Sequence, residues 1–145
     1  MSGAARDPDE PCSPIESAFS KTRTVDGGTV VATGIFAGIA VRDYESAAQW
    51  YVQLFGSEPA FCPNDIEAVW QLAEGLYMYI VEDPDRAGGA VSMIWVDDPV
   101  SEIARIAERG LQPVDVEEHG NVRKYVYRDA DGNETGVGGE VSQPK

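Results

Sequence analysis

The sequence has few of the residues that usually hold transition metals. Its 145 residues include one histidine, His119, and two cysteines, Cys12 and Cys62. The two cysteines lie in regions of different composition and lack the close spacing of zinc ligands, so we expect two free thiols. This scarcity argues against both a zinc site and a disulfide framework.

Basic residues are also scarce, and the sequence has no long apolar run. It contains 11 Lys and Arg residues against 25 Asp and Glu residues, which gives a formal net charge of −14. Such a surface repels phosphate backbones and anionic headgroups, so we expect no nucleic-acid and no membrane partner. No stretch approaches the roughly 18 apolar residues of a spanning helix, and the N-terminus shows no signal-peptide pattern. The composition predicts a cytoplasmic protein whose partners are neutral or cationic small molecules.

The chain divides into a tail and one domain. Residues 1–28 are rich in proline, glycine and charge, and they bury too little apolar surface to offset the entropy of ordering. We expect this segment to be a flexible N-terminal tail. Residues 29–145 show alternating apolar stretches and have the length of one domain.

Residues 29–145 contain the same order of expected elements twice. Each copy has a strand, a helix and three further strands. In the first half Asp43 is placed to cap the helix and Gly56 to end it; in the second half Asp98 caps, Pro99 follows and Gly110 ends the helix. The expected strands are Ile35–Val41, Glu58–Phe61, Glu67–Leu72, Leu76–Val81, Val91–Val96, Val114–Glu117, Val122–Arg128 and Thr135–Val137. Val41, Asp43 and Ser46 match Val96, Asp98 and Ser101 at a constant offset of 55 residues. The repeat predicts an α+β fold in which two βαβββ modules form a curved mixed sheet with helices on the convex face.

Three stretches resemble the vicinal oxygen chelate superfamily, which includes glyoxalases, bleomycin resistance proteins and extradiol dioxygenases. They are Ile39-Ala40-Val41-Arg42-Asp43, Gln49-Trp50-Tyr51 with Leu54-Phe55-Gly56, and Tyr127-Arg128-Asp129-Ala130-Asp131-Gly132-Asn133. The resemblance covers about residues 33–139. In the last stretch Ala130 stands where the family motif has proline.

Metal-dependent members of that superfamily use histidine on the first strand of each half and an acidic residue on the last strand. The matching positions in this sequence are Phe36, Tyr79, Val91 and Gly136. None of these supplies the imidazole or carboxylate that a divalent ion requires. We therefore expect a member without metal ligands and without a cofactor.

Strand alternation predicts which side chains line the concave face, because successive residues point to opposite sides of a sheet. Counting from the four positions above gives a cleft dominated by aromatic rings. The expected ligand-binding residues are Phe36, Trp70, Tyr77, Tyr79, Met93, Trp95 and Lys124, with Glu134 as a weak candidate for an acid or base.

We interpret the chain as a metal-free small-molecule binding protein that holds a planar or cationic ligand. Aromatic faces stabilise a cation by roughly 0.5 to 2 kcal/mol per contact. The alternatives are a glyoxalase-like lyase, isomerase or dioxygenase that uses Glu134 or a tyrosine, and a partner-binding regulatory module. Rings of this kind also fill cores and interfaces, and we expect a homodimer because a curved sheet has open edges.

Overall fold

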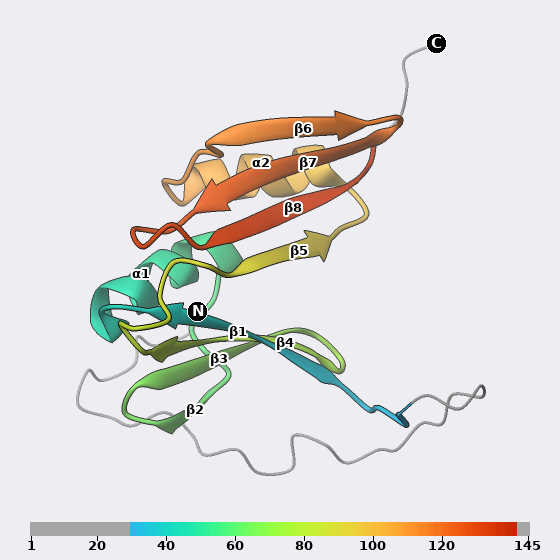
Figure 1. Cartoon of the computed structure of the whole chain (residues 1–145). Helices are drawn as coiled ribbons and strands as arrows, with labels where there is room; N and C mark the ends of the chain where they lie inside the picture. Colours follow the sequence, from blue (N-terminus) through green and yellow to red (C-terminus); the bar gives the residue numbers. More distant parts are fainter. Residues whose placement is uncertain (1–29, 142–145) are drawn as a thin grey trace.

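The computed structural model describes residues 30–141, so the expected N-terminal tail lies outside the described residues. The chain forms two modules, each a four-stranded sheet with one helix (Figure 1). This confirms the α+β class and the two βαβββ modules. The curved sheet is divided into two halves at the module boundary, because the described strands of one module do not pair with those of the other.

The first module contains β1 (Ile35–Val41), α1 (Tyr44–Phe55), β2 (Phe61–Asn64), β3 (Glu67–Ala73) and β4 (Leu76–Glu82). The second contains β5 (Val91–Trp95), α2 (Pro99–Glu108), β6 (Asp115–His119), β7 (Val122–Arg128) and β8 (Glu134–Glu140). The sheet orders are β1-β4-β3-β2 and β5-β8-β7-β6. In each sheet the first strand is parallel to the last one, and the other pairs are antiparallel.

Both helices begin at the caps expected from the sequence. Oδ2 of Asp43 accepts a hydrogen bond from the backbone N–H of Ser46 at 3.0 Å, and Asp98 accepts one from Ser101 at 3.2 Å. Each carboxylate satisfies an N–H group that the first helical turn leaves unpaired. Gly56 ends α1 with a φ of 86°, a left-handed conformation that favours glycine.

The second strand differs most from the sequence expectation, and β8 (Glu134–Glu140) is longer than the expected Thr135–Val137. The second strand was expected at Glu58–Phe61, whereas β2 covers Phe61–Asn64 and includes Pro63. Proline is tolerated there because β2 is an edge strand, and an edge strand has N–H groups that need no partner in the sheet.

The helix-facing sides of both sheets contribute to one hydrophobic core. Ile39, Met78 and Ile80 of the first sheet belong to the same buried cluster as Tyr127 and Val137 of the second. Neither helix of residues 30–141 packs on the opposite faces of the two sheets. We call them the helix-free faces.

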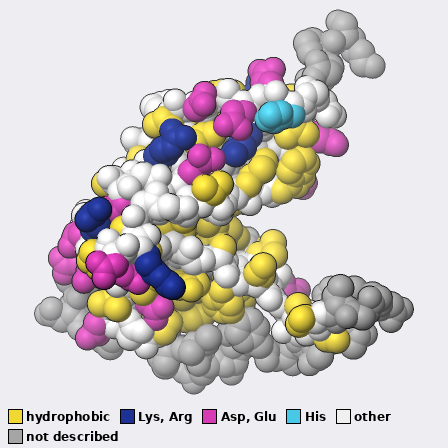
Figure 2. All heavy atoms as spheres, viewed as in Figure 1, with side chains coloured by type: hydrophobic (Ala, Val, Ile, Leu, Met, Phe, Trp, Pro, Cys, Tyr) yellow, Lys and Arg dark blue, Asp and Glu magenta, His cyan; other side chains and the backbone are white. Residues whose placement is uncertain are grey.

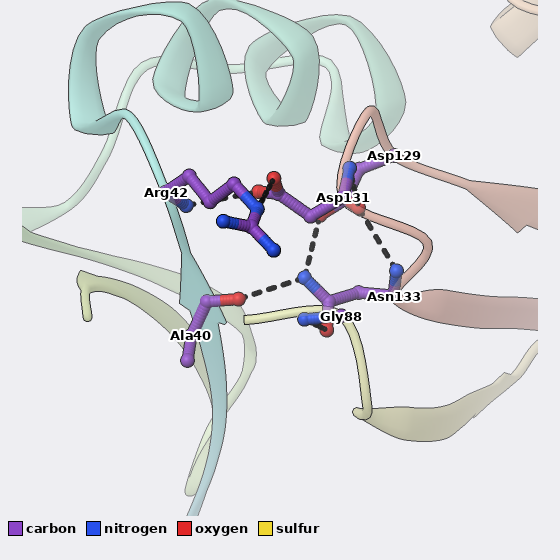
Figure 3. A network of polar contacts seen from close by, with 6 residues as sticks. All are labelled: Ala40, Arg42, Gly88, Asp129, Asp131 and Asn133. Carbon is purple, nitrogen blue, oxygen red and sulfur yellow. Dashed lines mark hydrogen bonds and ion pairs between the residues drawn. The ribbon is translucent and has the colours of Figure 1, made fainter. Parts of the chain in front are cut away.

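The amide of Asn133 is the central polar joint between the modules (Figure 3). It lies in the turn between β7 and β8 and is fully buried. Its Nδ2 donates to the carbonyl oxygen of Ala40 in β1 at 2.8 Å and to Oδ2 of Asp129 at 2.9 Å. Its Oδ1 accepts from the backbone N–H groups of Gly88 and Ala90 at 3.1 and 3.0 Å. One side chain therefore ties the last turn of the chain to the first strand and to the connector between the modules.

Two aspartates of the same turn extend this joint. The hydroxyl of Tyr51 in α1 donates to Oδ2 of Asp129 at 2.7 Å. Burial, and then the Asp129 carboxylate, raise the pKa of Tyr51 well above its usual value. Asp131 accepts from the backbone N–H of Arg42 at 3.0 Å and forms an ion pair with its guanidinium at 3.5 Å. The sequence predicted only a tight turn here, so the joint is a finding of the structure.

A second contact joins the ends of the two helices. Arg109, which follows α2, donates hydrogen bonds to the carbonyl oxygens of Gln53 and Leu54 in the last turn of α1. In return the side-chain amide of Gln53 donates to the carbonyl oxygen of Arg109 at 2.9 Å. These bonds satisfy carbonyl groups that a helix end leaves unpaired.

The substitution Asn133→Ala should lower the free energy of unfolding by about 2 to 4 kcal/mol, because it leaves buried N–H and C=O groups without partners. Asn121→Ala, at an exposed turn residue, is the matched control and should change it by less than about 0.5 kcal/mol. Urea unfolding of both variants measures the difference. Equal stabilities would contradict the role of Asn133 as a joint.

Candidate functional site

The molecule is hollowed between the parts that carry the two sheets, and hydrophobic side chains gather on both sides of the hollow (Figure 2). We call this hollow the cleft. The helix-free faces of the two sheets border the cleft, because α1, α2 and the core occupy the other faces. Successive residues of a strand point to opposite faces, so every second residue of each strand faces the cleft.

The first sheet contributes four aromatic rings to its helix-free face, which we call the aromatic wall. Phe36 stacks on Tyr77 with 4.4 Å between ring centroids and an interplanar angle of 8°. Tyr79 meets Phe36 edge-on at 6.4 Å, and Phe61 meets Tyr77 at 6.3 Å. Gly38 makes room for Tyr79, since a Cβ there would lie 2.6 Å from the phenol ring. The structure thus brings together three of the predicted residues, Phe36, Tyr77 and Tyr79, but Tyr77 is only 4% exposed and packs in a buried cluster with Phe61.

The second sheet presents a flatter surface, which we call the glycine wall. Val91, Met93 and Trp95 of β5 are 74%, 43% and 58% exposed on its helix-free face. Gly136 and Gly138 of β8 lie beside them in register. A Cβ at Gly138 would meet the Met93 methyl group at 2.9 Å, so Met93 lies across the glycine. The predicted residues Met93 and Trp95 are therefore on the expected face.

A group of charged side chains also lies on the glycine wall. Lys124 of β7 lies over Gly136, and its Nζ is 3.2 Å from Glu134 and 3.6 Å from Glu117. Arg128 forms a second ion pair with Glu134 at 3.3 Å. The predicted acid or base, Glu134, is thus held by two cations.

Trp70 does not belong to the cleft, which corrects the sequence prediction. It is 1% exposed, packs against Phe55 with 5.3 Å between ring centroids, and donates from Nε1 to the carbonyl oxygen of Ser57 at 2.9 Å. The cause is an irregularity in the pairing of β3 with β4 between Gln71 and Ala73. A shift of one residue turns every following side chain to the other face.

Sequence reasoning missed Phe61 of the aromatic wall and the partners Glu117 and Arg128 of the charged group. Phe61 was placed at the end of an expected strand, whereas it begins β2. Glu117 and Arg128 stand opposite Lys124 and Glu134 in neighbouring strands. Pairing the expected strands by charge would have found these two.

Cys62 is not a free thiol, which corrects a second expectation. Its sulfur is in a disulfide bond, and the hydroxyl of Tyr44 lies 3.8 Å away. Cys12, the other cysteine, lies outside the described residues.

The four positions that correspond to the family's metal ligands do not fit a metal ion. Phe36, Tyr79, Val91 and Gly136 lie at matching points in the register of the two modules. Among these side chains only the Tyr79 hydroxyl offers an oxygen. Between residues 30 and 141, no three His, Cys, Asp or Glu side chains are grouped so that they could hold a metal.

A separate pocket of about 280 Å³ lies where α1 begins, next to the turn that joins β7 to β8. Its charged side chains already have partners, since Asp43 caps α1, Asp131 binds Arg42 and Asp129 binds Tyr51. The pocket is therefore part of the joint between the modules.

Comparison with known proteins gives the family. No protein-family model and no curated protein matches the chain. A solved structure of a glyoxalase/bleomycin resistance protein from Catenulispora acidiphila DSM 44928 is 42% identical, with a TM-score of 0.73. That match covers 76% of this chain and 100% of that one. The chain belongs to the glyoxalase/bleomycin resistance family.

More distant structures share the fold of this family. A bleomycin-binding protein in complex with bleomycin is 18% identical, with a TM-score of 0.60, and covers 74% of this chain and 98% of its own. TnmS3, an antibiotic binding protein from Streptomyces sp. CB03234, is 19% identical, with a TM-score of 0.64, and covers 78% and 99%.

Neither helix in the described part of this family member is long and apolar enough to cross a membrane.

Truncation of two tryptophans of this family member should lower the free energy of unfolding by very different amounts. Trp70→Ala should lower the free energy of unfolding by about 3 to 5 kcal/mol, as large-to-small changes in packed cores do. Trp95→Ala removes a ring that is 58% exposed and should cost less than about 1 kcal/mol. Guanidinium unfolding of the two variants tests this. A large loss for Trp95→Ala would place that ring in the core instead of the cleft.

Proposed function

We propose that the chain is a metal-free small-molecule binding protein that holds a planar or cationic ligand between the aromatic wall and the glycine wall. The observation that carries this proposal is the exposure of large apolar side chains on two faces that border one hollow. Phe36 is 36% exposed and Trp95 58%, although both lie on strands. Apolar surface concentrated in this way marks a site of interaction. Sequestration of the ligand is then the mechanism.

The aromatic wall suits flat ligands. Phe36, which is 36% exposed, stacks on the buried ring of Tyr77, and the half-buried ring of Tyr79 meets Phe36 edge-on. Aromatic ligands gain from offset stacking and from edge contacts with such rings. The related proteins described as binding bleomycin or another antibiotic support a small-molecule ligand for this fold.

The glycine wall allows a ligand to approach the backbone of β8 closely, and it offers few polar groups for specific binding. Gly136 and Gly138 leave the centre of β8 without side chains, and the flexible chains of Met93 and Lys124 lie against it. Both chains are unbranched, so they can move to admit a ring. Methionine also packs favourably against aromatic rings.

The charges favour a cationic ligand over an anionic one. The described cations of the glycine wall, Lys124 and Arg128, are paired with Glu117 and Glu134. They therefore offer an anion no unpaired charge. The net charge of −14 attracts cations to the protein over longer distances.

An enzyme that uses Glu134 is supported less well. A proton carrier needs oxygen atoms free to contact the substrate, and both oxygens of Glu134 are engaged, one by Lys124 and one by Arg128.

Trp95→Ala should weaken ligand binding about 5- to 150-fold, or by about 1 to 3 kcal/mol, because it removes the largest exposed ring of the glycine wall. Bleomycin and a panel of planar aromatic cations are the probes, each paired with a neutral ring of matched size. Titration by calorimetry measures the dissociation constants.

Val100→Ala, at an exposed residue of α2 outside the cleft, is the matched control and should leave affinity unchanged. A chelator should have no effect on binding. Unchanged affinity of Trp95→Ala for a probe that binds the native protein would remove Trp95 from the site. Loss of binding on chelation would overturn the metal-free proposal.

We also propose a homodimer, because β5 is an edge strand whose Val91 and Trp95 are strongly exposed. Light scattering at micromolar concentration should give twice the chain mass of 15.7 kDa. Val91→Asp should return the mass to that of one chain, since a buried charge opposes association. A monomer mass for the native protein would contradict the dimer.

A further inference from the structure

Lys124 lies along the middle of β8 on the glycine wall. Its Cα is beside Gly138, where an added Cβ would lie 2.9 Å from it. Its Cγ, Cδ and Cε cover Gly136, where an added Cβ would lie 3.1, 3.2 and 2.5 Å from these atoms. Its ammonium group reaches Glu134 and donates a hydrogen bond to Oε2 at 3.2 Å. The side chain therefore occupies the space that the two glycines leave over the strand.

Two carboxylates from different strands hold the ammonium group of Lys124. Oε2 of Glu134 in β8 lies 3.2 Å from Nζ, and Oε1 of Glu117 in β6 lies 3.6 Å from it. The side chains of Lys124 and Glu134 are 19% and 18% exposed, so this position is shielded but still reached by solvent. Hydrogen bonds between a cationic N–H group and a carboxylate are among the strong ones in proteins. The two carboxylates therefore form a position for a cationic N–H donor, which Lys124 fills in this structure.

Glu134 keeps a partner when Lys124 moves away, because Arg128 binds its other oxygen. Nη2 of Arg128 donates to Oε1 of Glu134 at 3.3 Å, and the two residues are directly paired in register. The ion pairs of Lys124 are partly exposed, and such pairs add little to stability. A released lysine also regains rotamer freedom. Movement of Lys124 thus leaves an anionic position that is already oriented, and it requires little free energy.

The strands around this position carry an excess of negative charge on the same face. Alternation from Glu117 and Glu134 places further carboxylates of β6 and β8 beside them. The acidic side chains of β5 to β8 on this face are Asp115, Glu117, Glu134 and Glu140. The basic ones are Lys124, Arg128 and His119, whose Nε2 is 3.9 Å from Glu117. When Lys124 leaves, the remaining charges attract an incoming cation and repel an anion.

We propose that the position of the Lys124 ammonium group is the cation subsite of the cleft. This inference rests on the proposed function and names the ligand class, a flat aromatic ring that carries a primary ammonium group on a short linker. The ligand ammonium takes the place of Nζ between Glu134 and Glu117, and Lys124 turns away into solvent. The ring then lies over Gly136, beside Met93, which is paired with Gly136 in register. Lys124 is thus a displaceable cover, and Glu134 determines specificity for the cation.

Lys124→Met tests the displacement, because it removes the competing ammonium group and keeps an unbranched apolar chain. The probes are 1-naphthylmethylamine and the neutral 1-naphthylmethanol, titrated by calorimetry. The amine should bind Lys124→Met about tenfold more tightly than the native protein. Lys124→Arg, which keeps a cation, should show no such gain. Arg105→Met, the matched control on α2, removes one positive charge away from this face and should leave affinity unchanged.

Glu134→Gln tests the subsite itself, because it keeps the shape of the side chain and removes its charge. Affinity for the amine should fall about tenfold, and affinity for the alcohol should change by less than about twofold. The same substitution in Lys124→Met should abolish the gain in affinity for the amine. Glu118→Gln is the matched control, since it changes the net charge equally on the opposite face of β6. An equal loss for both probes in Glu134→Gln would assign that residue a structural role and overturn the subsite.

The two probes separate this inference from the proposed function. Both probes could bind with a loss on Trp95→Ala, yet the amine could gain nothing from Lys124→Met and lose nothing from Glu134→Gln. That result would keep the cleft as the ligand site and reject the cation subsite. Binding of neither probe to the native protein or to Lys124→Met would overturn both.

Discussion

The buried amide of Asn133 is the constraint on which the arrangement of the two modules depends. The described strands of the two sheets do not pair with each other, so backbone hydrogen bonding between strands cannot fix their relative position. That position rests on the shared core, on the contact between the helix ends and on the turn that contains Asn133. A side chain with two donor hydrogens and an oxygen acceptor can satisfy a strand, a carboxylate and a connector at once. Its bonds are directional, and apolar packing alone would define the angle between the sheets less sharply.

This joint explains how the chain can keep a hollow with apolar walls. Exposed rings such as Trp95 would be buried if the two sheets closed on each other, and burial of apolar surface is favourable by about 25 cal/mol per Å². Closing would move β1 relative to the turn between β7 and β8, and it would break the bond from Asn133 to Ala40. The cost of leaving buried polar groups unpaired opposes that movement. Stability at the joint therefore helps to keep the cleft open some distance away.

The sequence predicted the elements well where local chemistry decides them. Asp43 and Asp98 cap their helices as expected, and β1 and β7 have the expected bounds. The family resemblance was confirmed through a 42% identical structure. The predictions were weaker where distant residues decide. Asn133 was expected in a turn, but its bond to Ala40 spans 93 residues and leaves no local signal.

The misplacement of Trp70 has a more specific cause. Ala73 pairs with Leu76, and an unbroken register from that pair would set Trp70 opposite Tyr79 and thus on the cleft side. The irregularity between Gln71 and Ala73 sets Trp70 opposite Met78 in the core. One extra residue in a strand cannot be read from apolar alternation, because both registers alternate equally well.

The two modules share one topology but differ in the surfaces they give the cleft. In the first sheet the space over Gly38 is filled by a rigid phenol ring, whereas in the second the spaces over Gly136 and Gly138 hold the flexible chains of Lys124 and Met93. The cleft therefore has rigid rings on one side, and on the other side it has flexible side chains that can change conformation. Rigid rings lose little conformational entropy when they bind, and flexible chains can adjust to ligands of different thickness. Two modules of one topology thus give an asymmetric cleft, and the proposed ligand suits both sides, because rigid rings favour an aromatic group and flexible chains tolerate variation in its shape.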